Sequence, residues 1–127
     1  MRRWRRGGRH EVVVLDRSGA ERLVVVSIGG GGFAESYKTL ELAEQAAVAL
    51  PKDDAGKRVR WVIVYGPYYA GHVPESDDAV RRLRYEAALL ELFAASDVVV
   101  CNAGYNTVSE VQVCGTPAVI IPLFTTG

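Results

Sequence analysis

Residues 97–122 read DVVVCNAGYNTVSEVQVCGTPAVIIP, and this stretch decides the fold that we expect. Val98 to Cys101 form a continuous apolar run that is rich in valine, which is typical of a parallel strand covered on both faces. The NAGYN turn then leads into a helix that starts near Thr107. The CGTP sequence predicts the end of this helix, with its glycine just past the last turn. A second buried strand is predicted over 118–121.

The rest of the chain repeats this alternation of apolar strands and amphipathic helices. Strands are predicted over 11–16, 22–28, 60–65 and 80–85, the last of them short, charged and edge-like, and helices over 36–50 and 86–96. Turn residues between the first two strands allow them to form a hairpin. Such alternation indicates an α/β fold, a Rossmann-like sandwich with a mainly parallel sheet. Its ligand crevice is expected at the carboxyl ends of the strands.

Length and composition are those of one soluble globular domain. The chain has 127 residues, of which 49% are hydrophobic and 24% charged, and its formal net charge is +0. No apolar run approaches the roughly 20 residues of a membrane span, and no apolar segment follows the basic N-terminus as it would in a secretory signal. Cys101 and Cys114 lie within apolar elements and favour a reducing compartment over a disulfide framework. We therefore expect a cytoplasmic protein.

Residues 1–10, MRRWRRGGRH, form a basic segment that we expect to be disordered, followed by a single domain over 11–127. A solvated tail is the favoured interpretation. The alternative is an electrostatic arm for anionic lipid or nucleic acid, with Trp4 as an interfacial anchor at a membrane surface. Of these partners, we expect no nucleic acid. We also expect no bound metal, because His72 has no second ligand at metal-binding spacing.

Two glycine-containing turns could together hold a diphosphate. Four consecutive glycines follow the second strand, and among them Gly31 and Gly32 offer backbone amides to a phosphate. The turn before the last helix adds the amides of Tyr105, Asn106 and Thr107, where a helix N-terminus favours negative charge. Neither turn is a P-loop, and GGGGF does not match the GxGxxG dinucleotide fingerprint.

Glu110 has two interpretations that its spacing does not separate. Thr107 and Glu110 match the T-x-x-E capping box, in which the glutamate accepts a hydrogen bond from the amide of the helix N-cap. That role is structural and needs no ligand. In the other interpretation Glu110 lies in the first helical turn beside a bound nucleotide and accepts hydrogen bonds from ribose hydroxyls.

The sequence resembles a known family at these two turns. The run SDVVVCNAGYNTVSEVQVCGTPAVIIP is similar to the donor-binding half of GT-B glycosyltransferases, in particular to family 28 with its UDP-N-acetylglucosamine transferase-like members. The segment VVVSIGGGGF is similar to the glycine loop that opens this half. The resemblance covers residues 22–123, and the first of these two motifs is the more specific one.

The resemblance implies a UDP-sugar as donor substrate, similar to UDP-N-acetylglucosamine, and no cofactor. At the donor diphosphate it places Gly31, Gly32, Asn106 and Thr107. It places Glu110 at the ribose hydroxyls, which favours the binding interpretation of this residue. Asn102 and Gly104 would shape the turn, and Tyr105 would line the pocket.

The chain departs from the family pattern at both ends. It stops at Gly127, where the family continues into a sugar-contacting segment, and it begins without the family's acceptor-binding first domain. The resemblance therefore implies a truncated donor-binding domain that is part of a hexosyltransferase and is inactive alone. A missing or partner domain would hold the acceptor, and we assign no histidine or carboxylate as the catalytic base.

Other functions compete with this one. A non-catalytic nucleotide-binding or scaffold module would bind UDP without turnover even when an acceptor domain is supplied. A nucleotide-sugar epimerase or hydrolase would require internal catalytic carboxylates or histidines, which are scarce in this sequence. A dehydrogenase of the dinucleotide-binding class is the least favoured, because its fingerprint is missing.

Overall fold

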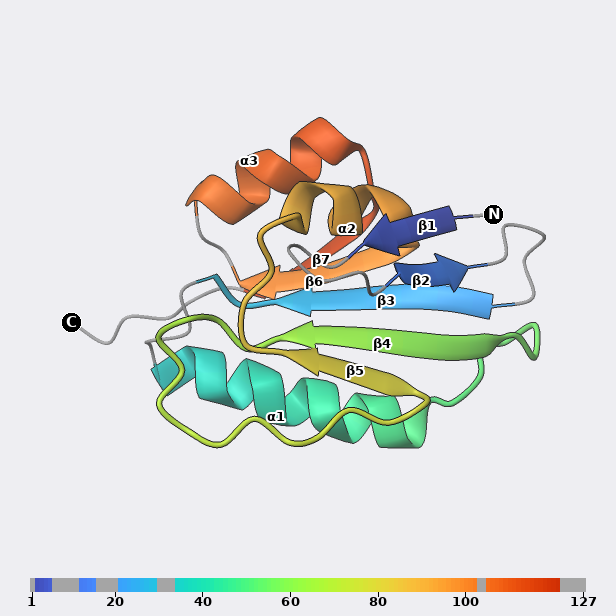
Figure 1. The fold of residues 1–127 in the computed structure, drawn as a ribbon, viewed down its shortest axis with the longest axis horizontal. Helices are drawn as coiled ribbons and strands as arrows, with labels where there is room; N and C mark the ends of the chain where they lie inside the picture. The colour runs from blue at the N-terminus through green and yellow to red at the C-terminus, as the bar shows by residue number, and fades with distance from the viewer. Residues whose placement is uncertain (1, 6–11, 16–20, 30–33, 103–104, 122–127) are drawn as a thin grey trace.

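The computed structural model describes residues 2–5, 12–15, 21–29, 34–102 and 105–121, and for 2–5, 12–15, 34–35 and 105–109 it describes the backbone alone. The elements follow in the order β1 (Arg2–Arg5), β2 (Val12–Leu15), β3 (Glu21–Ser27), α1 (Ala34–Ala49), β4 (Arg58–Val64), β5 (Val80–Leu83), α2 (Leu89–Ala95), β6 (Val98–Asn102), α3 (Tyr105–Cys114) and β7 (Ala118–Ile121). Strands β3 to β7 form a parallel sheet in the order β5-β4-β3-β6-β7 (Figure 1). The predicted α/β fold with a mainly parallel sheet is confirmed.

Strand β3 lies at the centre of this sheet, and both of its faces are covered. Its neighbouring residues Val25 and Val26 point to opposite faces, and each is 0% exposed. On one face Val26 packs in a cluster with Leu40 of α1, and on the other Val25 packs in a cluster with Phe93 of α2. Figure 1 shows α1 below the sheet and α2 and α3 above it. Full burial of a side chain such as that of Phe93 contributes about 1.5–3 kcal/mol, so these two layers hold the fold together.

Helix α3 ends where the sequence predicts. Gly115 directly follows the helix with φ +69°, a left-handed conformation that favours glycine. Its amide donates hydrogen bonds to the carbonyl oxygens of Val111 at 3.1 Å and Gln112 at 3.2 Å. These bonds satisfy carbonyl groups that the end of the helix would otherwise leave free, which is the role of a C-terminal glycine cap.

The N-terminal strands pair differently from the hairpin that the sequence allows. We expected residues 1–10 to form a disordered segment, and turn residues allowed the strand over 11–16 to pair with the strand over 22–28. Instead β1 pairs with β2 in an antiparallel ribbon, with Arg3 opposite Val14. The hairpin fails because both edges of β3 are occupied, by β4 on one side and by β6 on the other. Residues 6–11 lie outside the described part of the chain.

The two edge strands differ from each other in burial. Strand β5 is the short, charged edge strand that was predicted. Strand β7 forms at the predicted residues but is not buried, since Val119 is 53% and Ile120 44% exposed. It pairs with β6 alone, and the described helices leave it open to solvent. None of the described helices has the length and apolar character that crossing a membrane requires.

Candidate functional site

The carboxyl ends of β3 and β6 meet where the sheet changes its direction of winding. The two strands are parallel neighbours, with Ser27 in register with Cys101. From β3 the chain continues through α1 to β4 on one side, and from β6 it continues through α3 to β7 on the other. The loops after these strands therefore diverge, and a crevice at such a switch point is where open α/β sheets bind their ligands. Both predicted glycine turns follow these two strands, as expected.

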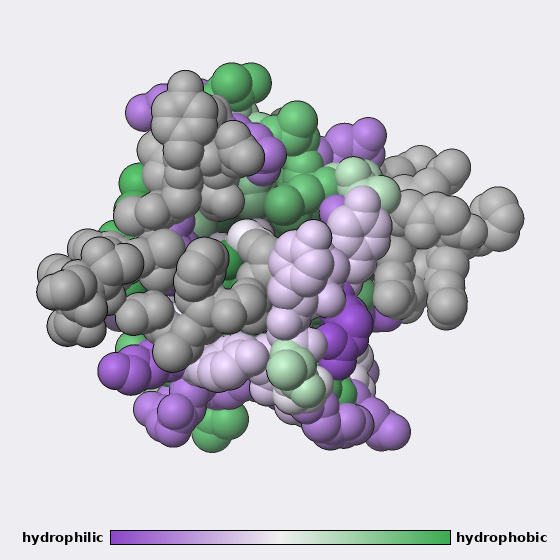
Figure 2. Space-filling view, turned by 90° about the vertical axis from the view of Figure 1, so that its left-hand side faces the viewer, coloured by the Kyte–Doolittle hydropathy of each residue, from purple (hydrophilic) through white to green (hydrophobic). Residues whose placement is uncertain are grey.

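Figure 2 looks onto the edge of the molecule at which β3, β4 and β6 end. Purple and pale, hydrophilic surface covers the lower part of this face, and a green, hydrophobic area lies above it. Gly29, the first of the four glycines, has φ +73° and turns the chain out of the sheet in a conformation that favours glycine. The described part of this edge therefore carries both polar and apolar surface, and the chain leaves β3 here in a tight turn.

The residues predicted for the site are described to different extents. Three glycines lie outside the described residues: Gly31, Gly32 and Gly104. The first turn of α3 consists of Tyr105, Asn106 and Thr107, whose side chains are also outside the described part. Backbone N–H groups in the first turn of a helix have no partner within that helix. The helix thus presents such groups directly after β6, as a phosphate site requires.

Helix α3 begins at Tyr105 rather than near Thr107, and this changes the position of Glu110. Thr107 is the third residue of the helix and Glu110 the sixth, so Glu110 lies in the second turn. Both interpretations of Glu110 placed it in the first turn and were wrong on that point. The capping box requires Thr107 at the N-cap, whereas the backbone of Thr107 lies inside the helix. Glu110 remains as a partly exposed carboxylate on the helix that follows β6.

Asn102, the last residue of β6, is locked by a buried polar cluster. The Thr39 hydroxyl donates a hydrogen bond to Asn102 Oδ1 at 2.9 Å, and Asn102 Nδ2 donates to Ser36 Oγ at 3.3 Å. The three residues are 3%, 4% and 1% exposed in the order Thr39, Asn102, Ser36. Buried polar groups that satisfy one another in this way fix a single arrangement. The cluster ties the start of α1 to the end of β6, and so joins the two elements that flank the predicted crevice.

Sequence reasoning singled out Asn102 but missed its two partners. Ser36 and Thr39 are spaced three residues apart and share the helix face that also carries Ala43. Polar side chains on the buried face of an amphipathic helix require a partner inside the protein, and this is the signal that could have identified them. The partner itself follows only from the parallel pairing of β3 with β6.

The described groups at this edge suit binding better than acid–base chemistry. Burial raises the pKa of the Cys101 thiol, so this residue stays protonated and packs as an apolar side chain. Within the described residues no group of three or more His, Cys, Asp or Glu side chains could hold a metal ion, and His72 is exposed. Helix amides and neutral hydrogen-bonding side chains are groups that bind an anion.

Comparisons with known proteins agree on one family. The model of the glycosyltransferase family 28 C-terminal domain matches residues 25–126. Two curated relatives carry the name UDP-N-acetylglucosamine–N-acetylmuramyl-(pentapeptide) pyrophosphoryl-undecaprenol N-acetylglucosamine transferase. The one from Aeromonas hydrophila is 31% identical over 122 residues, and the one from Nocardia farcinica is 31% identical over 124 residues. Each match covers 91% of this chain and 32% of the relative, so the chain spans about a third of their length.

Solved structures of glycosyltransferases share the fold. The glycotransferase of kitacinnamycin superposes with a TM-score of 0.61 at 25% identity, over 89% of this chain and 28% of that protein. The glycosyltransferase SnogD from Streptomyces nogalater superposes with a TM-score of 0.55 at 22% identity, over 92% of this chain and 30% of that protein. The fold is thus that of one part of a larger GT-B glycosyltransferase. Because the family model covers most of its length, the chain belongs to the glycosyltransferase family 28 C-terminal domain family.

Proposed function

We propose that this domain binds a UDP-sugar similar to UDP-N-acetylglucosamine at the carboxyl ends of β3 and β6, as the donor for hexosyl transfer. The observation that carries the proposal is the switch point itself, where the first turn of α3 and the buried Asn102 cluster lie together. Membership of the family and the names of the curated relatives support a nucleotide sugar over other anions. No cofactor beyond the donor is part of the proposal.

The proposed roles follow the geometry of a diphosphate at a helix N-terminus. Four residues hold the diphosphate through backbone amides and polar side chains: Gly31, Gly32, Asn106 and Thr107. Glu110 accepts hydrogen bonds from the ribose hydroxyls, which requires a carboxylate beyond the phosphate-binding turn. Asn102 shapes the turn together with Gly104 and Tyr105. The acceptor is held by another domain or subunit, since the chain spans about a third of its relatives.

The protein acts in the cytoplasm in this proposal, at the surface of a membrane. The supporting observation is the number of arginines among residues 1–10, which would attract anionic lipid. Sedimentation with vesicles tests this part separately. Binding to vesicles of phosphatidylglycerol that is lost in high salt supports it, and equal binding to neutral phosphatidylcholine vesicles contradicts it.

Calorimetric titration of the chain with UDP, UDP-N-acetylglucosamine, ATP and NAD tests donor binding. We expect the two uridine ligands to bind and the other two to bind more weakly. Glu110→Ala should weaken UDP binding about 10- to 150-fold, because a charge-assisted hydrogen bond contributes about 1.5–3 kcal/mol. Glu91→Ala removes an exposed carboxylate from the first turn of α2 and should leave affinity unchanged. A folded wild-type chain that binds no uridine ligand would refute the proposal.

The same titration tests whether the Asn102 cluster shapes the site. Thr39→Val keeps the shape of the side chain but removes the hydroxyl that bonds Asn102, and we expect UDP affinity to fall by about threefold or more. Thr116→Val is the matched control, because the Thr116 hydroxyl donates a similar 2.9 Å bond to the Phe93 carbonyl on the other face of the sheet. Thr39→Ser retains the hydroxyl and should restore affinity. Equal affinity in both valine variants would show that the cluster is only structural.

A further inference from the structure

A cavity lies on the α1 side of the sheet, beside the end of β4. It has a volume of about 530 Å³ and is lined by Tyr37, Leu40, Glu41 and Glu44 of α1 and by Tyr65, Tyr69, Ala70 and Gly71 of the segment that follows β4. This size is ordinary for a small-molecule site. We call it the tyrosine cavity. None of the residues proposed for the donor lines it.

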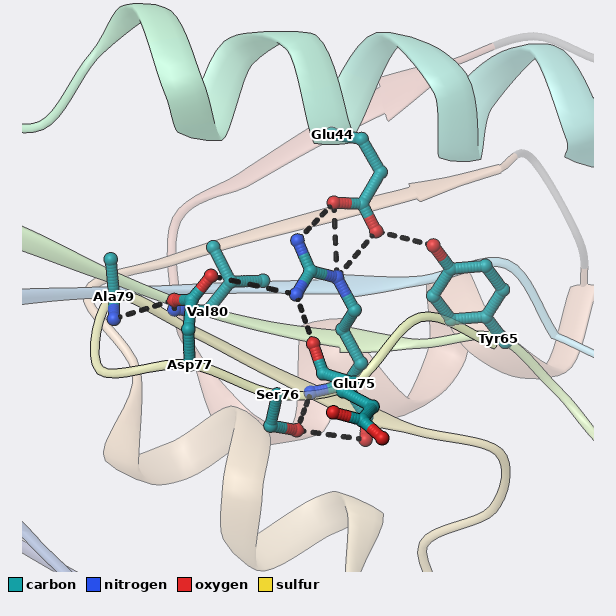
Figure 3. A network of polar contacts seen from close by, with 8 residues as sticks. Glu44, Tyr65, Glu75, Ser76, Asp77, Ala79 and Val80 are labelled. Atoms are coloured by element: carbon teal, nitrogen blue, oxygen red, sulfur yellow. Dashed lines mark hydrogen bonds and ion pairs between the residues drawn. The ribbon is translucent and has the colours of Figure 1, made fainter. Parts of the chain in front are cut away.

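The walls of the tyrosine cavity are held in place by a network that starts from β5. Arg82 donates hydrogen bonds to both carboxylate oxygens of Glu44, at 2.8 and 2.7 Å, and Tyr65 donates its hydroxyl proton to the same carboxylate. Figure 3 shows Glu44 reaching down from α1, with Tyr65 to the right, Asp77 to the left and Glu75 below. Arg82 also donates to the Glu75 carbonyl at 2.6 Å. The helix, the strand end and the loop are therefore tied to one another.

A second arginine, Arg84, holds the tyrosine rings that form one wall of the cavity. Arg84 donates hydrogen bonds to the carbonyls of Tyr69 at 2.6 Å and Gly71 at 3.0 Å, and its guanidinium lies 5.8 Å from the centre of the Tyr69 ring. The Tyr69 ring contacts those of Tyr37 and Tyr65, with centroids 5.2 and 4.9 Å apart. A side chain at Gly71 would collide with the Tyr69 ring, so glycine leaves room for this arrangement. The three tyrosine rings are therefore held by contacts within the chain itself.

The electrostatic character of the lining favours a positively charged ligand. Of the described residues that line the cavity, two are carboxylates and none is lysine or arginine. Arg82 offsets the charge of Glu44 and Arg84 lies over the Tyr69 ring, but no cation of the described residues pairs with Glu41, which is exposed beside Tyr37. Aromatic faces attract cations through their quadrupole, and an adjacent carboxylate adds to this attraction.

We propose that the tyrosine cavity binds an organic ammonium ion, with the ring of Tyr37 and the carboxylate of Glu41 as its main contacts. The inference is independent of donor binding, because none of its residues belongs to the proposed UDP site. The cavity does open near the same edge of the sheet, since Tyr65 follows β4 and Tyr37 lies near the start of α1. A ligand or substrate that carries an ammonium group could thus occupy it while the donor site is filled.

Choline and its neutral carbon isostere 3,3-dimethylbutan-1-ol distinguish charge recognition from simple apolar binding. Both are titrated into the chain, and the chemical shifts of the tyrosine rings are followed by NMR. We expect choline to bind about tenfold more tightly than the isostere. Equal shifts for the two probes would overturn the proposal. A titration in saturating UDP is the second arm, and loss of the choline effect there would place the probe in the donor crevice and also overturn it.

Two substitutions of exposed residues, which should spare the fold, test the proposed contacts. Tyr37→Leu removes the aromatic face and Glu41→Gln removes the charge, and each should reduce the preference for choline about threefold or more. The matched controls are Tyr68→Leu and Glu91→Gln, since both residues are exposed and neither lines the cavity. An unchanged preference in Tyr37→Leu and Glu41→Gln would overturn the assignment, whatever the chain does with UDP.

Discussion

The two edges of the parallel sheet reverse the usual relation between sequence and burial. Strand β5 reads VRRL, with two arginines, and yet its apolar residues are buried, with Val80 at 5% and Leu83 at 1% exposure. Strand β7 reads AVII, with no polar side chain, and yet Val119 and Ile120 are about half exposed, at 53% and 44%. The charged strand is the buried one. Apolar side chains indicate that a strand favours burial, but the helices that pack on the sheet decide whether the strand is buried.

The difference comes from what lies over each edge. Val80 belongs to the core cluster on the α1 side and Leu83 to the cluster on the α2 and α3 side, so β5 is covered on both faces. The Arg82 side chain extends over the rim, where it binds α1 and the loop before β5. Above β7 the described residues provide no such layer. The sheet is therefore covered at the β5 edge, which we call the finished edge, and exposed at the β7 edge, which we call the open edge.

Truncation of one apolar side chain at each edge tests this comparison most strongly. Leu83→Ala should lower the free energy of unfolding by about 2–5 kcal/mol, because it removes a fully buried side chain and leaves a cavity. Ile120→Ala should lower it by about 1 kcal/mol, because that side chain is already about half exposed. Urea denaturation of both variants measures the two values. A large loss in Ile120→Ala would mean that β7 is covered in solution, for example by a second copy of the chain.

Loss of the arginine at the finished edge should have the next largest effect. Arg82→Met leaves the partly buried Glu44 carboxylate without its main partner and should cost about 2–3 kcal/mol, somewhat less than for a fully buried pair. Arg60→Met is the matched control, since its 3.6 Å pair with Glu21 is more exposed and should contribute about 0–1 kcal/mol.

A double variant shows whether the unpaired charge is the cause. Replacing both partners, as Glu44→Leu with Arg82→Met, removes the uncompensated carboxylate and should recover part of the lost stability. If the double variant is as unstable as the sum of the two single ones, the network contributes through packing and not through the ion pair.

The sequence predicted most of the strands and helices correctly because the signals for them are local. Valine-rich strands, the glycine after α3 and the alternation of elements all act within a few residues, and they predicted the parallel sheet and the C-terminal end of α3. The partner of β2 was not predictable in this way. It depends on β3 having both edges occupied, which is a property of the whole sheet.

The same distinction between local and long-range signals applies to the candidate site. The two glycine turns could be placed beside one another from the rule that ligands bind at the carboxyl ends of parallel strands. The hydrogen bonds from Thr39 to Asn102 and from Asn102 to Ser36 join residues that are 63 and 66 positions apart, and no local pattern pairs them. The start of α3 was misplaced because T-x-x-E also occurs inside helices. A short motif constrains a boundary only when the residues before it are known.

Acid should loosen the finished edge before the open one, which is the smallest effect we predict. Burial alone would raise the pKa of Glu44, but hydrogen bonds from Arg82 and Tyr65, together with the charge of Arg82, hold it below its usual 4.5. A carboxylate whose pKa is lowered in the folded state stabilises the fold at pH values above its unfolded-state pKa. This contribution is lost as the pH falls below about 4.5 and through the folded-state pKa. The wild type should therefore lose more stability between about pH 6 and about pH 3 than Glu44→Gln, which cannot titrate.

Asp53, whose pKa is lowered by hydrogen bonds from Lys57 and Arg22, titrates equally in both proteins. Asp77 shares Arg82 with Glu44, so the difference between the two curves reports Glu44 together with its coupling to Asp77. Hydrogen exchange measured at each residue shows where in the structure the stability is lost. Amide protection in β5 should fall in acid for the wild type and less so for Glu44→Gln, while β7, which contains no titratable side chain, should respond alike in both. Parallel loss at the two edges would show that acid acts on the sheet as a whole and that the Glu44–Arg82 pair does not set the stability of its own edge.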